Sequence, residues 1–106
     1  MINNLELGKK VIKDKIPLIP KNPGVYRMIS AAGEILYIGK AKNINNRLSS
    51  YLNFNILSNR IKRLVGNLDN LKFIKTHTEI DALILESNLI KKYKPIFNIR
   101  LIDDKS

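Results

Sequence analysis

The sequence lacks cysteine altogether and contains a single histidine, His77. The absence of cysteine excludes disulfide bonds, thiolate zinc sites and cysteine nucleophiles. A bound metal ion would therefore need oxygen ligands or His77. The sequence also has no apolar run of about 18 residues, the length of a membrane-spanning helix, and no charged start followed by an apolar leader. We therefore expect a cytoplasmic protein without a signal peptide.

Acidic residues are scarce as well, which leaves the chain strongly basic. Its 106 residues include 9 Asp and Glu against 19 Lys and Arg, a formal net charge of +10. A surplus of this size favours a polyanionic partner, and nucleic acid ahead of an anionic membrane. Hydrophobic residues make up 44% of the chain, which is enough for one small globular domain and argues against disorder.

The first half of the chain predicts a basic leader followed by a hairpin. Residues 1–16 form the leader, which has the pattern of a short helix ended by Pro17. The proline-rich residues 17–24 predict an extended segment. Residues 25–30 and 34–38 are rich in β-forming side chains and are joined by a short turn containing glycine. They predict an antiparallel β-hairpin.

The second half predicts helices around one further strand. A helix capped by Asn43 carries an apolar stripe, a second helix runs from about residue 57 to 66, and residues 71–76 predict a third strand. A longer helix begins with a capping box at residues 78–81 and continues to about residue 93, where Pro95 stops it. The order β-β-α-α-β-α indicates an α+β fold, with a small three-stranded antiparallel sheet flanked by helices.

Glu86 is the most informative single residue of the last helix. It lies on the apolar face, because the residues one turn before and one turn after it are hydrophobic. A buried carboxylate needs compensation. The compensation is either a salt bridge to one of the many basic residues or a metal ion at the floor of a cleft.

Two tyrosines, Tyr26 and Tyr37, lie one on each arm of the predicted hairpin. They are explained either as an aromatic cross-strand pair that stabilises the sheet or as a catalytic pair. A phenol acts as a general base when nearby cations favour its anion, and Lys40 and Arg47 follow closely enough to supply that field. Periodicity alone favours the structural explanation.

The motifs around these tyrosines resemble those of the GIY-YIG nuclease family. Gly24-Val25-Tyr26 and Tyr37-Ile38-Gly39 match the two signature motifs, with eleven residues from tyrosine to tyrosine. Arg47, Glu86 and Asn98 stand where the family keeps its arginine, its acidic residue and its terminal asparagine. One departure is Asn45, where a basic residue is usual, and one phosphate contact is therefore in doubt.

The closest resemblance within the family is to the N-terminal nuclease domain of the incising subunit of bacterial nucleotide excision repair. It spans about residues 17 to 104, and we place the nuclease domain at residues 17–100. Proteins of this kind are several times longer, so we expect residues 101–106 to begin a linker to C-terminal domains outside this chain. The resemblance implies damaged duplex DNA as substrate, incision 3′ to a lesion, and a damage-loading partner subunit that binds the absent segments. We expect this fragment to be a monomer.

The resemblance also implies a metal-dependent mechanism. Glu86 would be the only protein ligand of one Mg²⁺ or Mn²⁺, with water in the remaining positions, as hard cations allow. Tyr37 would act as general base, and Tyr26 would hydrogen-bond the water or the phosphate. Asn98 would orient a tyrosine or Glu86.

Basic residues would complete the site. Lys40 would depress the pKa of the base or help position water, and Arg47 would stabilise charge on the phosphate. A further set of basic side chains is expected to contact the DNA backbone: Lys42, Arg60, Lys62 and Arg63. Two alternatives remain open, a non-catalytic nucleic-acid-binding module and a stand-alone GIY-YIG nuclease that acts on other DNA.

Overall fold

The elements of the fold are those of the computed structural model, which describes residues 4–53 and 56–103. They are α1 (Leu5–Lys15), the 3₁₀ helix η1 (Ile16–Leu18), β1 (Gly24–Ile29), β2 (Ile35–Ala41), α2 (Ile44–Ser50), α3 (Asn59–Gly66), β3 (Asn70–Lys75), α4 (Glu79–Tyr93) and α5 (Ile96–Asp103). None of the helices in this described part has the length and apolar character needed to cross a bilayer.

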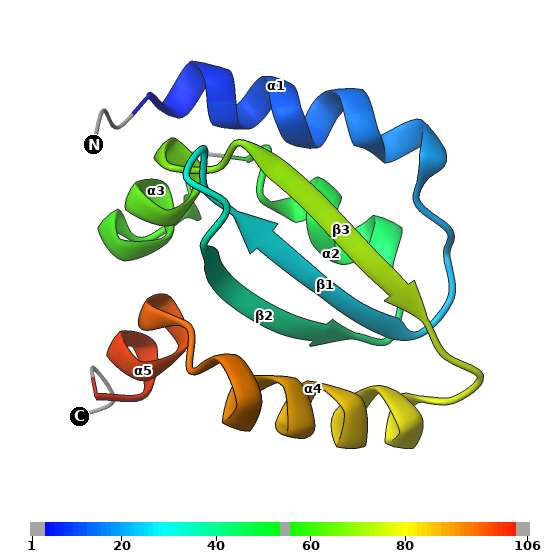
Figure 1. Cartoon of the computed structure of the whole chain (residues 1–106). Helices are drawn as coiled ribbons and strands as arrows, with labels where there is room; N and C mark the ends of the chain where they lie inside the picture. The colour runs from blue at the N-terminus through cyan, green and yellow to red at the C-terminus, as the bar shows by residue number, and fades with distance from the viewer. Residues whose placement is uncertain (1–3, 54–55, 104–106) are drawn as a thin grey trace.

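The three strands form one antiparallel sheet in the order β2-β1-β3, with β1 in the centre. Helices lie on both faces of this sheet, α1 on one side and α4 on the other (Figure 1). The predicted α+β class, the hairpin and the third strand are therefore confirmed. Because β1 pairs on both sides, β2 and β3 are both edge strands.

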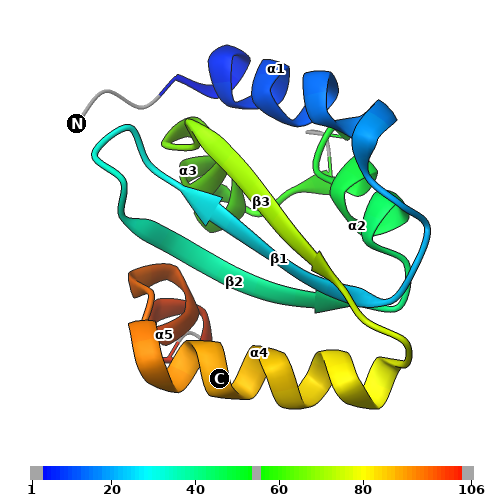
Figure 2. The ribbon, with the colours of Figure 1, turned by 45° about the vertical axis from the view of Figure 1, so that its right-hand side comes forward.

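The core has two parts, one on each face of the sheet. The larger part packs α1, α2 and α3 against the face that carries Tyr26 and Met28, both almost completely buried. The smaller part packs α4 against the opposite face, through Val25, Ile38 and Ala82. The view in Figure 2 shows α4 running along the face opposite α1.

A β-bulge in β2 decides which face Leu36 occupies. Met28 of β1 pairs with Tyr37, but Ile29 pairs with Ile35, so Leu36 is an extra residue in β2. The ladder is regular from Ala41 to Tyr37, and without the bulge strict alternation would place Leu36 on the α4 face. With it, Leu36 and Tyr37 both pack on the Tyr26 face, while Ile38 returns to the α4 face.

The helix boundaries follow the predicted caps. The Asn43 side chain accepts a hydrogen bond from the Asn46 N–H at 3.0 Å, and Thr78 Oγ1 accepts one from the Asp81 N–H at 3.0 Å. Both cap predictions are confirmed. The helix α4 ends at Lys94, which adopts the left-handed conformation with φ of 46° immediately before Pro95.

Two segments differ from the sequence-based expectation. The segment expected to be extended begins with η1, because a proline is tolerated in the first turn of a helix, where its missing N–H is not needed. The helix α5 was not predicted. The carbonyl of Pro95 accepts the N–H groups of Asn98 and Ile99, so the proline that ends α4 also begins α5.

The basic leader is packed against the rest of the fold. In α1, Ile12 is completely buried, and the Asn4 N–H donates to the Gly66 carbonyl at 2.7 Å. At the other end, α5 covers residues on both sides of the boundary predicted after residue 100. The boundaries at residues 16/17 and 100/101 themselves stay predictions.

Candidate active site

Four of the predicted site residues gather around β2 from four different elements. Tyr26 comes from β1, Tyr37 from β2, Arg47 from α2 and Glu86 from α4. The rings of Tyr26 and Tyr37 lie 6.1 Å apart between centroids, inclined at 46°. Glu86 and Arg47 both act electrostatically on the Tyr37 phenol, which places an anion and a cation beside it.

A third tyrosine, Tyr51, belongs to the same cluster. Its hydroxyl lies 2.6 Å from the hydroxyl of Tyr26, and the two rings meet at 72° with centroids 6.1 Å apart. Sequence reasoning missed this role, because Tyr51 falls on the apolar stripe of α2 and such a residue usually belongs to the core. The signal that was available is a hydroxyl at a buried position, which needs a partner.

Gly39 of the second motif makes room for Tyr26. The two residues are paired across β1 and β2. A Cβ at position 39 would lie 2.5 Å from both Cζ and the hydroxyl oxygen of Tyr26. Any other residue would therefore displace the ring from the cluster.

Glu86 is half-buried at the edge of β2. Its Oε2 accepts the main-chain N–H of Lys40 at 2.8 Å. Within the described residues it forms no ion pair, so the salt-bridge explanation of this carboxylate is wrong there. No group of three or more Asp, Glu or His residues that could hold a metal ion occurs in that part of the chain.

Lys40 contributes to this geometry through its backbone. Its side chain is exposed, and the contact it makes with the site is the N–H donated to Glu86. The cation that lowers the pKa of Tyr37 is Arg47, and the expected role of the Lys40 side chain, on that pKa or on water, stays a prediction.

Asn98 is buried and binds the main chain of Ile38 on both sides. Its Oδ1 accepts the Ile38 N–H and its Nδ2 donates to the Ile38 carbonyl, each at 2.8 Å. The contact that the structure shows is with the residue next to Tyr37, and the expectation that Asn98 orients a tyrosine or Glu86 stays a prediction. Because β2 is an edge strand, alternate residues turn their main-chain polar groups away from β1. Asn98 and Glu86 form hydrogen bonds with the main chain of two such residues, Ile38 and Lys40 respectively.

Burial keeps the tyrosine cluster protonated at neutral pH. Desolvation raises the pKa of Tyr26 well above its usual value, with neighbouring phenols adding to the effect, and raises the pKa of Tyr51 to about 12. The pKa of Tyr37 is raised by burial first and then by the Glu86 carboxylate, while Arg47 lowers it. Tyr26 is 1% exposed, so Tyr37 is the tyrosine that can reach a substrate.

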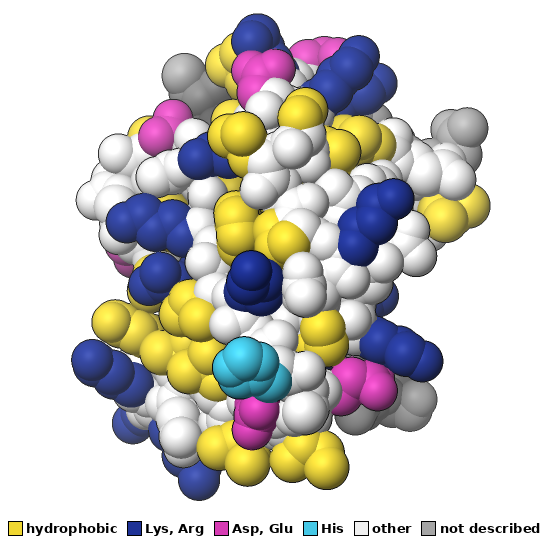
Figure 3. Space-filling view, turned by 90° about the vertical axis from the view of Figure 1, so that its right-hand side faces the viewer, with side chains coloured by type: hydrophobic (Ala, Val, Ile, Leu, Met, Phe, Trp, Pro, Cys, Tyr) yellow, Lys and Arg dark blue, Asp and Glu magenta, His cyan; other side chains and the backbone are white. Residues whose placement is uncertain are grey.

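The residues expected to contact DNA divide into two groups. Lys42 lies beside Lys40 and lines a small pocket of about 230 Å³ with it. Lys and Arg side chains are spread over the face of the molecule that Figure 3 shows, which is the right-hand side of the view in Figure 1. Arg60, Lys62 and Arg63 belong to α3, which lies near the tip of the β1–β2 hairpin, at the other end of β2.

Asn45, the departure from the family pattern, has a structural role in this chain. Its Nδ2 donates to the carbonyls of Ile16 and Ile19, each at 2.9 Å. The N–H of Asn45 donates to the Pro20 carbonyl at 3.1 Å. These bonds tie the start of α2, and with it Arg47, to the segment that precedes β1.

Comparisons with known proteins agree with this geometry. The model of the UvrC-like GIY-YIG domain matches residues 22–99. UvrABC system protein C of Maricaulis maris is 50% identical over 93% of the chain, and that of Gluconobacter oxydans is 48% identical over 93%. The chain spans only 16% and 15% of the length of these two relatives.

A solved structure matches the fold as well as the sequence. The GIY-YIG N-terminal endonuclease domain of UvrC from Thermotoga maritima, bound to its catalytic divalent cation, magnesium, has a TM-score of 0.73 and 44% identity. The match covers 81% of this chain and 93% of that one. The chain therefore belongs to the UvrC-like GIY-YIG domain family.

Proposed function

We propose that this domain is a divalent-cation-dependent DNA endonuclease in which Tyr37 is the general base and Glu86 holds the cation. The observation that carries the proposal is the convergence of Tyr37, Arg47 and Glu86 at the edge of β2. A half-exposed phenol between a cation and a carboxylate has no evident structural purpose. The three groups supply a base, a phosphate-binding cation and a metal ligand.

The donor set at Glu86 fits a hard divalent cation. Its carboxylate is half-buried, receives one main-chain N–H and has no cationic side chain as partner within the described residues. Mg²⁺ commonly binds through one or two carboxylates and retains several water molecules. The bound ion would supply charge neutralisation for the phosphate and the leaving oxygen.

The tyrosines have different roles in this proposal. Tyr37, in its ionised form, would accept the proton of the attacking water at its phenolate oxygen and become a neutral phenol. Tyr26, buried and joined to the hydroxyl of Tyr51, would hold the Tyr37 ring in place rather than contact water itself. Arg47 would bind the phosphate with its planar, multidentate guanidinium group and would also favour the Tyr37 anion.

For the whole protein, we propose the function of UvrABC system protein C, the name that its relatives carry. The domain would make the 3′ incision in nucleotide excision repair, in the cytoplasm, on damaged duplex DNA delivered by UvrB through segments outside this chain. The chain by itself would be a monomer. What supports these finer statements is the 45–50% identity to several UvrABC system C proteins.

The test of the catalytic proposal is Mn²⁺-dependent nicking of supercoiled plasmid. We expect Glu86→Gln to abolish both nicking and Mn²⁺ binding measured by calorimetry. The matched control is Glu79→Gln, which removes an exposed carboxylate from the same helix and should cost only about 0.3–1 kcal/mol of helix-dipole stabilisation. Equal nicking by wild type and Glu86→Gln would contradict the proposal, as would a Glu79→Gln variant that loses activity to the same extent.

The base is tested by the pH dependence of the nicking rate. Because the pKa of Tyr37 lies above its usual value, the anion is a minority species at pH 7. The rate should therefore rise about tenfold per pH unit between about pH 7 and 9. Tyr37→Phe should remove the rise together with the activity. A flat profile in the wild type would exclude Tyr37 as a base that must ionise.

A further inference from the structure

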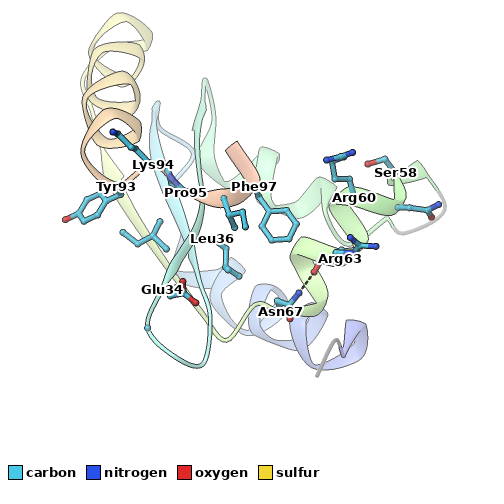
Figure 4. A pocket seen from close by; sticks show the side chains of 14 residues that line it. Glu34, Leu36, Ser58, Arg60, Arg63, Asn67, Tyr93, Lys94, Pro95 and Phe97 are labelled. Atoms are coloured by element: carbon cyan, nitrogen blue, oxygen red, sulfur yellow. Dashed lines mark hydrogen bonds between the residues drawn. The ribbon is translucent and has the colours of Figure 1, made fainter. Parts of the chain in front are cut away.

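A second cavity, distinct from the catalytic residues, lies at the other end of β2. It has a volume of about 990 Å³, at the upper limit of typical ligand pockets, and Tyr37, Arg47 and Glu86 do not line it. Its walls come from the β1–β2 hairpin, from α3 and from the junction of α4 and α5. Figure 4 shows Arg60 and Arg63 on one side, Leu36 and Phe97 between, and Tyr93 with Lys94 at the opposite end.

The lining of this cavity, here called the hairpin groove, combines cations with apolar and aromatic surface. Arg60, Arg63 and Lys94 face it against a single carboxylate, Glu34. Tyr93 remains 43% exposed although it is a large aromatic side chain. Cations favour an anionic ligand, and an exposed ring beside apolar side chains favours a planar one.

The backbone conformation of Lys94 is a second observation that points to a ligand. It is the only non-glycine residue with positive φ in the described part of the chain, and it adopts φ of 46° at the end of α4. Glycine occupies that conformation at less cost, and strained residues cluster at functional sites. The helix dipole accounts for a positive charge near this position, but Lys91 and Lys92 already supply it in the last turn.

We propose that the hairpin groove binds a single-stranded segment of the DNA substrate, with a base against Tyr93 and phosphates facing Lys94 and the arginines of α3. The proposal deepens the proposed nuclease function and rests on it for the identity of the ligand. A single strand fits better than a duplex, because stacked base pairs hide the faces that an exposed aromatic ring would bind. Tyr93 follows Glu86 by seven residues along α4, about 10 Å of helix, so one strand can reach from the groove to Glu86 within a few nucleotides.

The test measures binding without cleavage, so that it does not depend on the nuclease reaction. The parent protein is the Glu86→Gln variant of the full chain in EDTA, and the probe is a fluorescein-labelled oligothymidine of about 12 nucleotides, followed by anisotropy. Tyr93→Ala should weaken the Kd by about fivefold or more, as loss of one stacked base does, whereas Tyr93→Phe should retain it. Circular dichroism melting checks that each variant folds.

Lys94→Gly separates binding from stability. It relieves the backbone strain and should melt at the same temperature as the parent or higher, yet it removes one phosphate contact. The slope of log K against log salt should fall by about 0.7. The matched control is Lys13→Ala, which removes an exposed charge from α1, away from the groove, and should leave that slope unchanged.

Three results would overturn the proposal. The first is an unchanged Kd in both Tyr93→Ala and Lys94→Gly. The second is equal affinity for the same length of duplex, with equal losses in the variants. The third is an oligoglutamate of the same length that binds as tightly as the oligothymidine, which would make the groove a site for acidic peptides. Loss of plasmid nicking with this binding intact would count only against the catalytic proposal.

Discussion

Replacing Asn98 by alanine should destabilise the domain by about 2–4 kcal/mol. The side chain makes two hydrogen bonds of 2.8 Å to the main chain of Ile38, whose side chain is completely buried. Each bond contributes about 0.5–1.5 kcal/mol net, and a buried Ile38 N–H or carbonyl left unsatisfied, which costs about 1–3 kcal/mol, brings the loss to the upper part of the expected range. The expected loss is a large part of the 5–15 kcal/mol that typically separates folded from unfolded domains.

Urea unfolding followed by circular dichroism measures this loss. With an m-value of about 2 kcal/mol/M, the midpoint should fall by about 1–2 M. Asn98→Asp provides a sharper version, because a protonated carboxyl can donate to the Ile38 carbonyl and accept from its N–H, as the amide does. The folded state should raise the pKa of that carboxyl. The stability it provides is therefore present at low pH and lost as the pH rises through the raised pKa.

The matched control for Asn98 is Asn46→Ala, which truncates an exposed asparagine on α2 and should change the midpoint little. A midpoint shift in Asn98→Ala no larger than in this control would refute the stability estimate. Loss of nicking in a variant of unchanged stability would instead indicate that Asn98 acts on the substrate or on the reacting groups directly.

Three other substitutions test the packing around the tyrosines. Gly39→Ala should abolish nicking and lower the melting temperature, since its Cβ would meet the Tyr26 ring at 2.5 Å; a fully active variant would disprove the close-packing explanation. Tyr51, whose pKa is raised to about 12, should stabilise the fold fully below about pH 10 and lose that contribution, about 2–3 kcal/mol, as the pH approaches 12. Tyr51→Phe should remove this part of the fall in unfolding free energy at high pH, measured by urea unfolding. The same pH dependence in the variant and the wild type would contradict the prediction. Asn45→Ala should lower kcat more than it raises KM, because two bonds of 2.9 Å hold the start of α2, whereas Asn46→Ala should change neither.

The helices and strands were predictable where apolar and polar residues alternate clearly or where a capping residue marks an end. The apolar stripes and caps of α2 and α4 and the β-forming runs of the hairpin were sufficient to place these elements. The bulge at Leu36 was not predictable, because Ile35-Leu36-Tyr37-Ile38 has no polar residue to mark the alternation of faces. The helix α5 was missed because its 8 residues follow a proline that also reads as a stop.

The site was predictable as a set of residues and less so as a set of contacts. The motifs identified both tyrosines, Arg47 and Glu86, which the structure brings together from four elements. The contacts of Lys40 and Asn98 could not be predicted, because each runs through a backbone N–H or carbonyl that every residue possesses.

The hairpin that carries the two motifs has one end where its length can change and one where it cannot. At the tip, residues 31–34 are exposed, Gly33 has φ of 87°, and a Cβ there would meet nothing within 4 Å. Extra residues would extend from this exposed turn without disturbing the core. Between Tyr37 and Gly39, where the pairing is regular, one residue more or less would turn Tyr37 toward α4. The number of residues between the two tyrosines can therefore change at the turn while the two rings keep their shared face, and this shared face identifies the pair.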